Sequence, residues 1–380
     1  MAPRKPSLTL GIEEEYLLVD PRTGELVAEQ PPGLMPACKE KLGDHVTHEL
    51  LLAQIEVGTA ICTDVAEARA DLARLRRTVA GLAADFGLAI VATSTHPLAS
   101  WRTQKSVDLE RYRILTRDLQ ALARRLVVCG MHVHAGVEDD DLRIDLMNQV
   151  AYFLPHLLAL SASSPFWEGQ DTGLKAFRPT IFGDLPRSGM PETFESYREW
   201  QRLLEIMAEC GVCDDPSKIW WDVRPSAKQP TLEMRICDIC THFEDAVTVA
   251  ALYQSILALL FRLRANNQRW RQYRPILLNE NKWRAQRWGV EGELADFGQL
   301  KMVPFAELVE ELVTLLTEEA RELGCLPEVQ RAPEIVARGT SADHQLRIYR
   351  EARAAGAEDV EARRAVARWL IEATLEGVPD

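Results

Sequence analysis

Hydrophobic and polar residues alternate in several short stretches of the first two-thirds of the chain. Alternation with a period of two is typical of half-buried strands, because successive side chains point to opposite faces. With β-branched content, this pattern predicts strands over Leu8–Val19, Ile55–Ile61, Leu88–Thr93, Val127–Val137, Lys218–Arg224 and Thr231–Asp238. Helical periodicity between them predicts helices over Val65–Ala84, Asp108–Ala123, Asp141–Ser161 and Thr193–Glu209.

From Phe243 onward the pattern is helical. It predicts helices over Glu244–Asn266, Asn279–Trp288, Pro304–Leu323 and Ser341–Ala355, with a last helix to about Leu375. Loops rich in Gly and Pro are expected at PPGLMP and FRPTIFGDLPRSGMP. No repeat, linker or break in composition divides the chain, so we expect one domain over residues 1–380. Strands followed by a run of helices indicate an α+β fold, with a largely antiparallel sheet covered by helices.

The first predicted strand, LTLGIEEEYLLV, carries three consecutive glutamates in an apolar run. On a strand, Glu13 and Glu15 share one face, whereas Glu14 shares the other with Ile12 and Tyr16. Two neighbouring carboxylates repel each other unless a cation or a proton lies between them. Glu14 needs a partner of its own, such as an arginine from a covering helix.

Other predicted strands also show one apolar and one polar face. Their polar faces carry Gln54 with Glu56, His132 with His134, Glu233 with Arg235, and Asp222 with Arg224. A solvated face would explain one such strand, but solvated faces favour Lys, Thr, Ser and Gln. A sheet face of carboxylates, imidazoles and arginines suits chemistry on phosphate and a metal, since oxygen ligands hold Mg²⁺ and arginines hold phosphates.

Composition and charge narrow the function further. The 380 residues carry a net charge of −13, which argues against a general nucleic-acid binder. The N-terminus has no signal-peptide pattern, and the longest apolar segment, Ala246–Phe261, is too short to span a membrane. Eight cysteines without a secretion signal suggest reduced thiols and a cytoplasmic location. The P-loop, the dinucleotide fingerprint and the HExxH zinc motif are missing from the sequence.

Two C-x2-C pairs, Cys210/Cys213 and Cys237/Cys240, leave a different function open. With His132 and His134 they would make a zinc-stabilised binding protein. Small buried side chains are the alternative interpretation, because cysteine is among the most often buried residue types.

A set of motifs resembles a known family. GIEEEYLLVD, STHPLASW, GMHVHAGV, SASSPFW-GQDTG, WWDVRPS…TLEMRICD and NKWRAQRWG are similar, in this order from Leu8 to about Gly289, to the type 2 glutamate–cysteine ligases, the bacterial carboxylate–amine ligases. The resemblance implies the glutamine synthetase/glutamate–cysteine ligase superfamily. Its fold is a curved, mainly antiparallel sheet of about six strands with helices behind it and ATP with Mg²⁺ in the concavity. It also implies a homodimer.

The resemblance implies a reaction and its main residues. ATP phosphorylates a carboxylate, and an amine attacks the resulting acyl phosphate. Two or three Mg²⁺ ions, replaceable by Mn²⁺, would be held by a set of residues comprising Glu13, Glu15, Glu49, Glu56, His132 and Glu233. Arg235, and Arg224 with it, would stabilise charge on the transferred phosphoryl group. Glu49 and Glu56 have opposite strand parity, so a turn or helical segment is expected between them.

Further residues are candidates for binding, each with a structural alternative. Arg113 and Arg178 would hold the substrate's free carboxylate, or make surface salt bridges. Ser164, Asp171 and Thr172 would line the amino-acid pocket, or cap and turn the chain. The remaining candidates are Thr95 and His96 near the site, Asn281, Arg284 and Arg287 as a helical stripe towards the nucleotide, and His134 for catalysis or a structural hydrogen bond. A phosphotransferase of the same superfamily, similar to the guanidino kinases, remains an alternative to the ligase.

Overall fold

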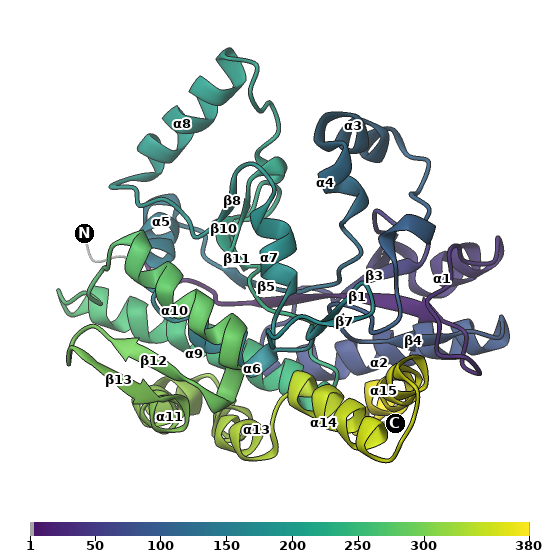
Figure 1. Cartoon of the computed structure of the whole chain (residues 1–380). Coiled ribbons are helices and arrows are strands. Elements are labelled where there is room, and N and C mark those ends of the chain that lie inside the picture. The colour runs from purple at the N-terminus through teal and green to yellow at the C-terminus, as the bar shows by residue number, and fades with distance from the viewer. Residues whose placement is uncertain (1–3, 380) are drawn as a thin grey trace.

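The computed structural model describes residues 4–379 and is organised around one antiparallel sheet (Figure 1). Six strands follow the order β10-β11-β5-β1-β3-β2, and β4 pairs with the far end of β1. Their bounds are Val223–Pro225, Thr231–Met234, Met131–Gly136, Leu10–Val19, Gln54–Gly58 and Val46–His48, with β4 at Ala89–Val91. Every pairing in this sheet is antiparallel, which confirms the predicted fold class.

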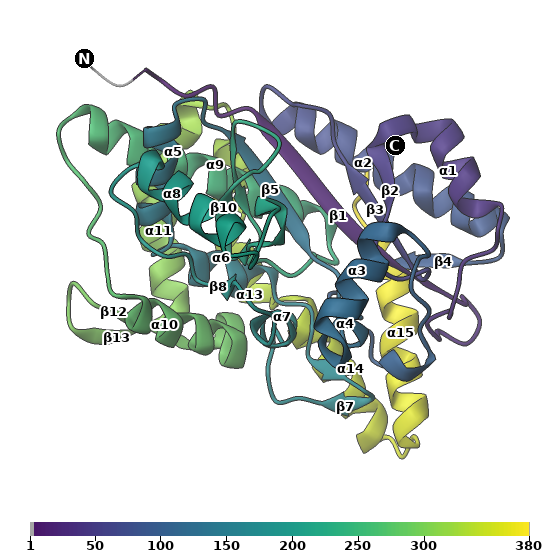
Figure 2. The ribbon, with the colours of Figure 1, turned by 90° about the horizontal axis from the view of Figure 1, so that it is seen from above.

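The helices divide between the two faces of the sheet. In Figure 1, α2 (Val65–Asp85), α9 (Phe243–Ala265) and α15 (Asp359–Leu375) lie below it, and α3 (Glu110–Leu119), α4 (Ala121–Arg124) and α7 (Arg178–Gly183) stand above it. Seen from above, α3, α4 and α7 lie in front of the sheet and α15 lies behind it (Figure 2). The lower helices bury the apolar face of the strands, so the polar face opens between the upper helices.

Glu14 has the partner that its buried face requires. Arg76 of α2 is fully buried, and its Nε and Nη2 donate to the two carboxylate oxygens of Glu14 at 3.0 and 2.5 Å. Its remaining donors reach the backbone carbonyls of Thr241, Cys240 and Thr374 at 3.0–3.1 Å. The expectation of an arginine from a covering helix is confirmed, and this ion pair joins the sheet to both α9's leading loop and the last helix.

Several predicted elements are shorter or divided. The helix predicted over Asp141–Ser161 is two helices, α5 (Asp140–Val150) and α6 (Leu154–Ser161). Pro155 in the first turn of α6 has no N–H, and its ring would clash with a continuous helix. The helix predicted over Asp108–Ala123 divides into α3 and α4 at Gln120, where φ is +51°. The strand predicted over Lys218–Arg224 contains a 3-10 turn, a two-residue strand β9 (Trp220–Trp221) and the start of β10.

Other elements were not predicted. Helix α1 (Leu34–Leu42) begins inside PPGLMP, and α7 lies inside FRPTIFGDLPRSGMP, so both loop predictions were wrong in part. Short β-pairs were also missed: β6 (Phe166–Trp167) with β7 (Gln170–Asp171), β8 (Ser188–Gly189) with β9, and β12 (Glu293–Asp296) with β13 (Lys301–Pro304). The remaining helices are α8 (Tyr197–Glu209), α10 (Pro275–Trp288), α11 (Phe305–Glu322), α12 (Leu326–Gln330), α13 (Ala332–Arg338) and α14 (Ser341–Ala354).

Within residues 4–379, α9 alone is long and apolar enough to satisfy the criteria for a membrane span. Its most apolar 18-residue window has a mean hydropathy of 1.7, but 78% of that window is buried inside the protein. The apolar character of α9 is therefore explained by its place behind the sheet.

Candidate active site

The register of five neighbouring strands brings the predicted polar residues together. Glu13 of β1 pairs with His132 of β5 on one side and with Gly58 of β3 on the other. Glu15 lies opposite Glu56 on β3. Glu233 of β11 lies between His134 of β5 and Arg224 of β10. Because paired residues in a ladder point to the same face, these side chains form one continuous polar floor.

The floor belongs to a cavity of about 410 Å³. All six predicted metal ligands line it, together with the three predicted catalytic residues. These lining residues are Glu13, Glu15, Glu49, Glu56, His132, Glu233, His134, Arg224 and Arg235. The alternation of polar and apolar positions therefore predicted the strand residues that this cavity brings together.

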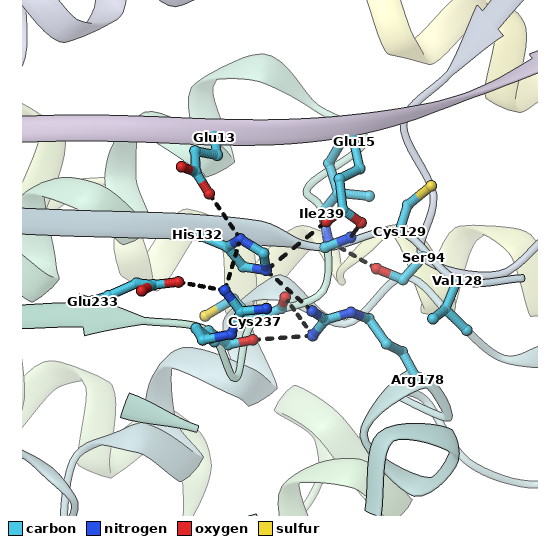
Figure 3. Close-up of polar contacts among 12 residues, drawn as sticks. Glu13, Glu15, Ser94, Val128, Cys129, His132, Arg178, Glu233, Cys237 and Ile239 are labelled. Carbon is cyan, nitrogen blue, oxygen red and sulfur yellow. Dashed lines mark hydrogen bonds and ion pairs between the residues drawn. The ribbon is translucent and has the colours of Figure 1, made fainter. Parts of the chain in front are cut away.

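Two imidazoles flank Glu13. His132 Nδ1 is 3.0 Å from Glu13 Oε2 and His134 Nε2 is 3.5 Å from Glu13 Oε1 (Figure 3 shows Glu13 with His132). Burial alone would raise the pKa of Glu13, but the imidazoles of His132 and His134 hold that pKa well below its usual value. Burial and the nearby Arg235 lower the pKa of His132 to about 4, so its imidazole is neutral at pH 7. Glu13 is therefore a carboxylate at neutral pH.

The two histidines differ in the hydrogen bonds that their ring nitrogens make. The neutral His132 donates from Nδ1 to Glu13, and its Nε2 faces Arg178 Nη2 at 3.5 Å. His134 Nδ1 bonds the Thr231 hydroxyl at 2.9 Å, while its buried Nε2 has no hydrogen-bond partner among the described residues. The sequence pattern indicated metal binding by His132, whereas in the structure it is Nε2 of His134, 3.5 Å from Glu13 Oε1, that makes no hydrogen bond.

Glu233 is held by two arginines. Arg224 Nε and Nη2 donate to its carboxylate oxygens at 2.9 and 3.1 Å, and Arg235 Nη1 donates to it as well. Burial would raise the pKa of Glu233, but Arg235 and Arg224 hold it well below the usual value. Arg224 is fixed further by the carbonyls of Ser217 and Ile219, at 2.7 and 2.6 Å. Arg224 is thus part of the floor's framework, and Arg235 lines the cavity beside it.

A second group of carboxylates lies beside Glu13. Glu15 accepts a hydrogen bond from the N–H of Gly130 at 2.7 Å. Burial and repulsion by Glu49 raise the pKa of Glu15 to about 8. Burial, followed by repulsion from Glu49, Glu13 and Glu15, raises the pKa of Glu56 well above its usual value. A turn at Leu52–Ala53 separates Glu49 from β3, which confirms the expected interruption between Glu49 and Glu56.

These features fit a site for divalent cations. Glu13, His134 and Glu233 each offer a ligand atom, and the three atoms lie within 4.8 Å of one another. Burial, followed by repulsion from Glu49, raises the pKa values of Glu15 and Glu56, and a cation between these carboxylates would offset that repulsion. Oxygen ligands in this number suit a hard ion such as Mg²⁺ better than zinc.

Arg178, the first residue of α7, lies beside the floor on the polar face of the sheet and does not line the cavity. Its side chain is buried, and Nη1 donates to the carbonyls of Arg235 and Cys237 at 3.1 Å each (Figure 3). A Cβ at Gly130 would come within 2.2 Å of its Nη2, so a glycine is required there. Its Nη2 faces His132 Nε2 at 3.5 Å, and its buried Nε has no hydrogen-bond partner among the described residues. A role for Arg178 in holding a substrate carboxylate stays a prediction.

The predicted amino-acid pocket residues have structural contacts. Ser164 Oγ donates to buried Asp238 at 2.6 Å and accepts from the N–H groups of Phe177 and Arg178, which fixes the start of α7. Asp171 accepts from the N–H of Gly173, and Thr172 donates to the carbonyl of Pro165. Thr95 and His96 are buried and do not line the cavity. In the structure, Ser164, Asp171 and Thr172 cap and turn the chain. Thr95 and His96 are packed in the interior.

The predicted nucleotide-binding stripe, Asn281, Arg284 and Arg287, does not line the cavity either. The amide of Asn281 bonds both backbone groups of Ala295, and Arg284 Nε donates to the carbonyl of Glu293. Arg287 lies against the ring of Trp288, 5.6 Å from its centroid. Asn281 and Arg284 thus fix β12 onto α10, and nucleotide binding by the stripe stays a prediction. Arg113 is likewise on the surface, paired with Asp108, with 59% of its side chain exposed.

The zinc alternative has no ligand set in the structure. Cys237 and Cys240 are buried in the main core, and Cys210 is exposed at the end of α8. The one group of potential metal ligands found among the described residues contains no cysteine.

Two parts of the site were not predicted. The loop of residues 226–229 between β10 and β11 lines the cavity. So does an apolar wall, which consists of Leu50, Leu115, Leu126, Val128, Phe182, Leu185 and Trp220. A second cavity of about 240 Å³ adjoins the first and shares Glu13, His134 and Gln229 with it. We call this second cavity the glycine slot because three glycines line it: Gly11, Gly58 and Gly136. Residues brought together from separate loops leave no periodic signal in the sequence.

Comparison with known proteins gives a family match over nearly the whole chain. Residues 9–367 match the family model described as glutamate-cysteine ligase family 2 (GCS2). A Rhodospirillum rubrum protein named "Putative glutamate--cysteine ligase 2" is 53% identical over 376 residues, covering 98% of this chain and 97% of that protein. A protein of the same name from Chloroflexus aggregans is 43% identical over 373 residues, covering 98% and 93%.

Solved structures share the fold at low sequence identity. The crystal structure of a glutamate–cysteine ligase from Francisella tularensis in complex with AMP has a TM-score of 0.69 and 13% identity, covering 100% of this chain and 91% of that one. A bifunctional glutathione synthetase from Pasteurella multocida has a TM-score of 0.68 and 15% identity, covering 96% of this chain and 52% of that one.

Proposed function

Because the chain belongs to glutamate–cysteine ligase family 2, we propose that it joins a carboxylate to an amine at the expense of ATP, through an acyl phosphate and with Mg²⁺. It is a carboxylate–amine ligase of the glutamate–cysteine ligase type. The observation that carries the mechanism is the floor, in which carboxylates, imidazoles and arginines from five adjacent strands and the residue after β11 face one cavity. This combination serves reactions between two anions, ATP and a carboxylate.

The residues that would hold Mg²⁺ form two groups. One is Glu13, His134 and Glu233, supported by their short mutual distances. The other is Glu15, Glu49 and Glu56, supported by the raised pKa values of Glu15 and Glu56. When bound, the ions would neutralise and bridge the phosphate oxygens of ATP. Mn²⁺ is expected to substitute, since it accepts similar oxygen ligands.

Arginines would stabilise the charge of the transferred phosphoryl group. Arg235 lines the cavity and keeps its guanidinium beside Glu233 and His132. Arg224 is anchored by two carbonyls and would act by holding Glu233 in place. Fixed donors of this kind can contribute several powers of ten in rate, because they need no rearrangement when charge develops.

The glycine slot would receive the nucleoside part of ATP. It opens beside Glu13 and His134, where phosphates would lie, and its lining includes Gly11, Gly58 and Ile61. A Cβ on Gly11 or Gly58 would meet nothing closer than 3.7 Å, so the floor of the slot has room above it. A flat base fits against such a surface without clashing with side chains.

The proposed reaction has two steps, phosphorylation of the carboxylate and attack by the amine. A carboxylate oxygen attacks the γ-phosphorus, the bond to the β–γ bridging oxygen breaks, and ADP leaves with the electron pair. The amine nitrogen then attacks the acyl carbon, the C–N bond forms, and the bond to the phosphate oxygen breaks to release inorganic phosphate. The nitrogen gives up one proton. A cavity that excludes water during this sequence protects the acyl phosphate.

The whole chain is proposed to act as one catalytic unit in the cytoplasm. The C-terminal helices are tied to the segments behind the site: Gln345 of α14 donates to the carbonyl of Ser163 at 3.0 Å, and Thr374 of α15 accepts from the N–H of Ala92 at 2.9 Å. All eight cysteines are free, as a reducing compartment would keep them.

Product analysis tests the ligase against the phosphotransferase of the same superfamily. The purified chain is incubated with ATP, Mg²⁺, glutamate and hydroxylamine, which captures an activated carboxylate as a hydroxamate. We expect ADP, inorganic phosphate and hydroxamate in equal amounts. ADP without inorganic phosphate, together with a phosphorylated acceptor, would establish the phosphotransferase instead.

A further inference from the structure

The loop of residues 226–229, between β10 and β11, lines the active-site cavity, and the chemistry described so far gives it no role. All four of its residues contribute to the lining. Gln229 also lines the glycine slot, together with Pro230 and Thr231, which follow it. The loop therefore extends across the junction between the cavity and the slot. Lys228 lines the cavity and is the residue directly before Gln229.

ATP bound as proposed would cross this junction. Its nucleoside would lie in the glycine slot and its γ-phosphate would reach the floor, so the rest of the phosphate chain would lie between them. The residues that line both cavities are Glu13, His134 and Gln229. Glu13 brings a negative charge to this place and Gln229 brings none. A phosphate chain needs a cation here, and the ammonium group of Lys228 is next to Gln229 in the chain.

Lys228 differs from the other cations of the cavity in having no carboxylate partner. Among the described residues that line the cavity, the lysines and arginines are Arg224, Arg235 and Lys228. Both arginines bind the carboxylate of Glu233, Arg224 at 2.9 and 3.1 Å. The exposed Lys228 makes no side-chain hydrogen bond or ion pair with any other residue of 4–379. Its charge is therefore available to an anionic ligand.

The backbone that carries Lys228 is tied to the floor. The N–H of Ser226 donates to the carbonyl of Thr231 at 3.0 Å, which closes the loop at its base. The Ser226 hydroxyl accepts from the N–H groups of Lys228 and Gln229, each at 3.4 Å. The Thr231 hydroxyl bonds Nδ1 of His134 at 2.9 Å. Because the backbone is held in this way, mainly the side chain of Lys228 has to become ordered when a ligand binds.

A substrate carboxylate is the other anion that Lys228 could bind, and two observations favour phosphate. The first is the position of the loop, which reaches the glycine slot through Gln229. The second is the charge of the cavity, whose lining includes five glutamates: Glu13, Glu15, Glu49, Glu56 and Glu233. ATP brings more negative charge into this surrounding than a single carboxylate does. A lysine ammonium is a compact charge with three donors, which suits phosphate oxygens.

We infer that Lys228 is a catalytic residue that binds the phosphate chain of ATP where the cavity meets the glycine slot. This inference rests on the ligase function proposed above. The ammonium donates hydrogen bonds to the β-phosphate oxygens. When a carboxylate oxygen attacks the γ-phosphorus, the bond to the β–γ bridging oxygen breaks and its electron pair stays on ADP. Lys228 stabilises this added charge and keeps its own proton.

Three variants test this role through hydroxamate formation from ATP, Mg²⁺, glutamate and hydroxylamine. Lys228→Met removes the charge and keeps the length of the side chain, whereas Lys228→Arg keeps the charge. Lys301→Met makes the same change at an exposed position of β13, outside both cavities. We expect Lys228→Met to lower kcat/KM for ATP at least tenfold and to leave the KM for glutamate within twofold. Lys228→Arg should stay within threefold of wild type, and Lys301→Met should equal it.

Calorimetric titration with ADP and Mg²⁺ measures the same contact without turnover, and Lys228→Met should raise the Kd of ADP at least fivefold. Unchanged values of this Kd and of kcat/KM for ATP would overturn the inference and leave the ligase function standing. A higher KM for glutamate at an unchanged KM for ATP would also overturn it, by assigning Lys228 to the substrate carboxylate. A wild-type protein that forms no hydroxamate and binds no ADP would reject the ligase function as well.

Discussion

Glu15 on β1 lies directly opposite Glu56 on β3, so two carboxylates face each other in register across the middle of the sheet. Both are partly buried, and both have pKa values raised by burial and by neighbouring glutamates. Such a pair is unfavourable unless a cation or protons neutralise it. This relationship links the stability of the protein to pH and to divalent metal.

The metal-free protein should lose stability as the pH rises. The pKa of Glu15 is about 8 in the folded protein, against an ordinary value of 4.5, so the folded state keeps a proton that the unfolded state releases. This contribution to the free energy of unfolding is fully present below about pH 4.5 and is lost as the pH rises through 8. Mg²⁺ should replace the proton. Calorimetry should show a small increase in Tm with Mg²⁺ at pH 6 and one of several degrees at pH 8.5.

The variant Glu15→Gln provides the control for that dependence, because its amide does not titrate. The increase in Tm with Mg²⁺ at pH 8.5 should fall to less than half of the wild-type increase. An Mg²⁺ effect that is the same at both pH values in the wild-type protein would argue against a metal between these carboxylates.

Glu13→Gln and Glu233→Gln should each lower kcat by about three powers of ten or more, because each removes a ligand charge from the floor. Circular dichroism should show an unchanged fold, since both positions carry isosteric amides. Glu351→Gln, an exposed change on α14, should retain wild-type activity. Turnover at the wild-type rate in both floor variants would refute the proposed metal site.

Arg76→Met should destabilise the protein by about 3–5 kcal/mol, because it leaves the Glu14 carboxylate buried without its partner. The double variant Glu14→Leu/Arg76→Met should recover much of that loss, since no buried charge remains. Urea denaturation measures both. A double variant as unstable as Arg76→Met alone would show that Arg76 acts mainly through its bonds to the carbonyls of Thr241, Cys240 and Thr374.

Gly58→Val should raise the KM for ATP at least tenfold by filling the glycine slot. The first added carbon has room, since its nearest neighbour is Glu13 Cγ at 3.8 Å, and strand β3 accepts a β-branched residue. Arg284→Ala is the matched test of the helical stripe, and it should leave the KM for ATP within twofold. The reverse result would move the nucleotide from the slot to α10.

The sequence predicted which strand residues form the floor, because the face that a strand residue occupies depends only on its position in the local sequence. The period of two in a strand decides which face Glu13, His132 or Glu233 occupies, whichever strand lies beside it. Glu14 could be recognised as a misplaced charge for the same reason, although nothing local pointed to Arg76, 62 residues away. The polar face and its need for cations could therefore be stated before the topology was known.

Residues outside the strands could not be predicted in this way. Arg178 carries the charge that a substrate carboxylate needs, and only the tertiary structure shows that its Nη1 donates to the carbonyls of Arg235 and Cys237. The stripe of Asn281 and Arg284 has helical spacing, but spacing does not tell which neighbour the stripe faces, and here it faces β12. The apolar wall comes from five separate segments, so it exists only after folding.

Isotope transfer tests the central claim, an acyl phosphate formed from ATP and a carboxylate, most directly. Glutamate labelled with ¹⁸O in its side-chain carboxylate is converted with ATP, Mg²⁺ and hydroxylamine, and the inorganic phosphate is analysed by mass spectrometry. We predict one ¹⁸O atom in each phosphate released, because the carboxylate oxygen that attacks the γ-phosphorus leaves with it. Phosphate without label, formed at the same rate as the hydroxamate, would contradict this account.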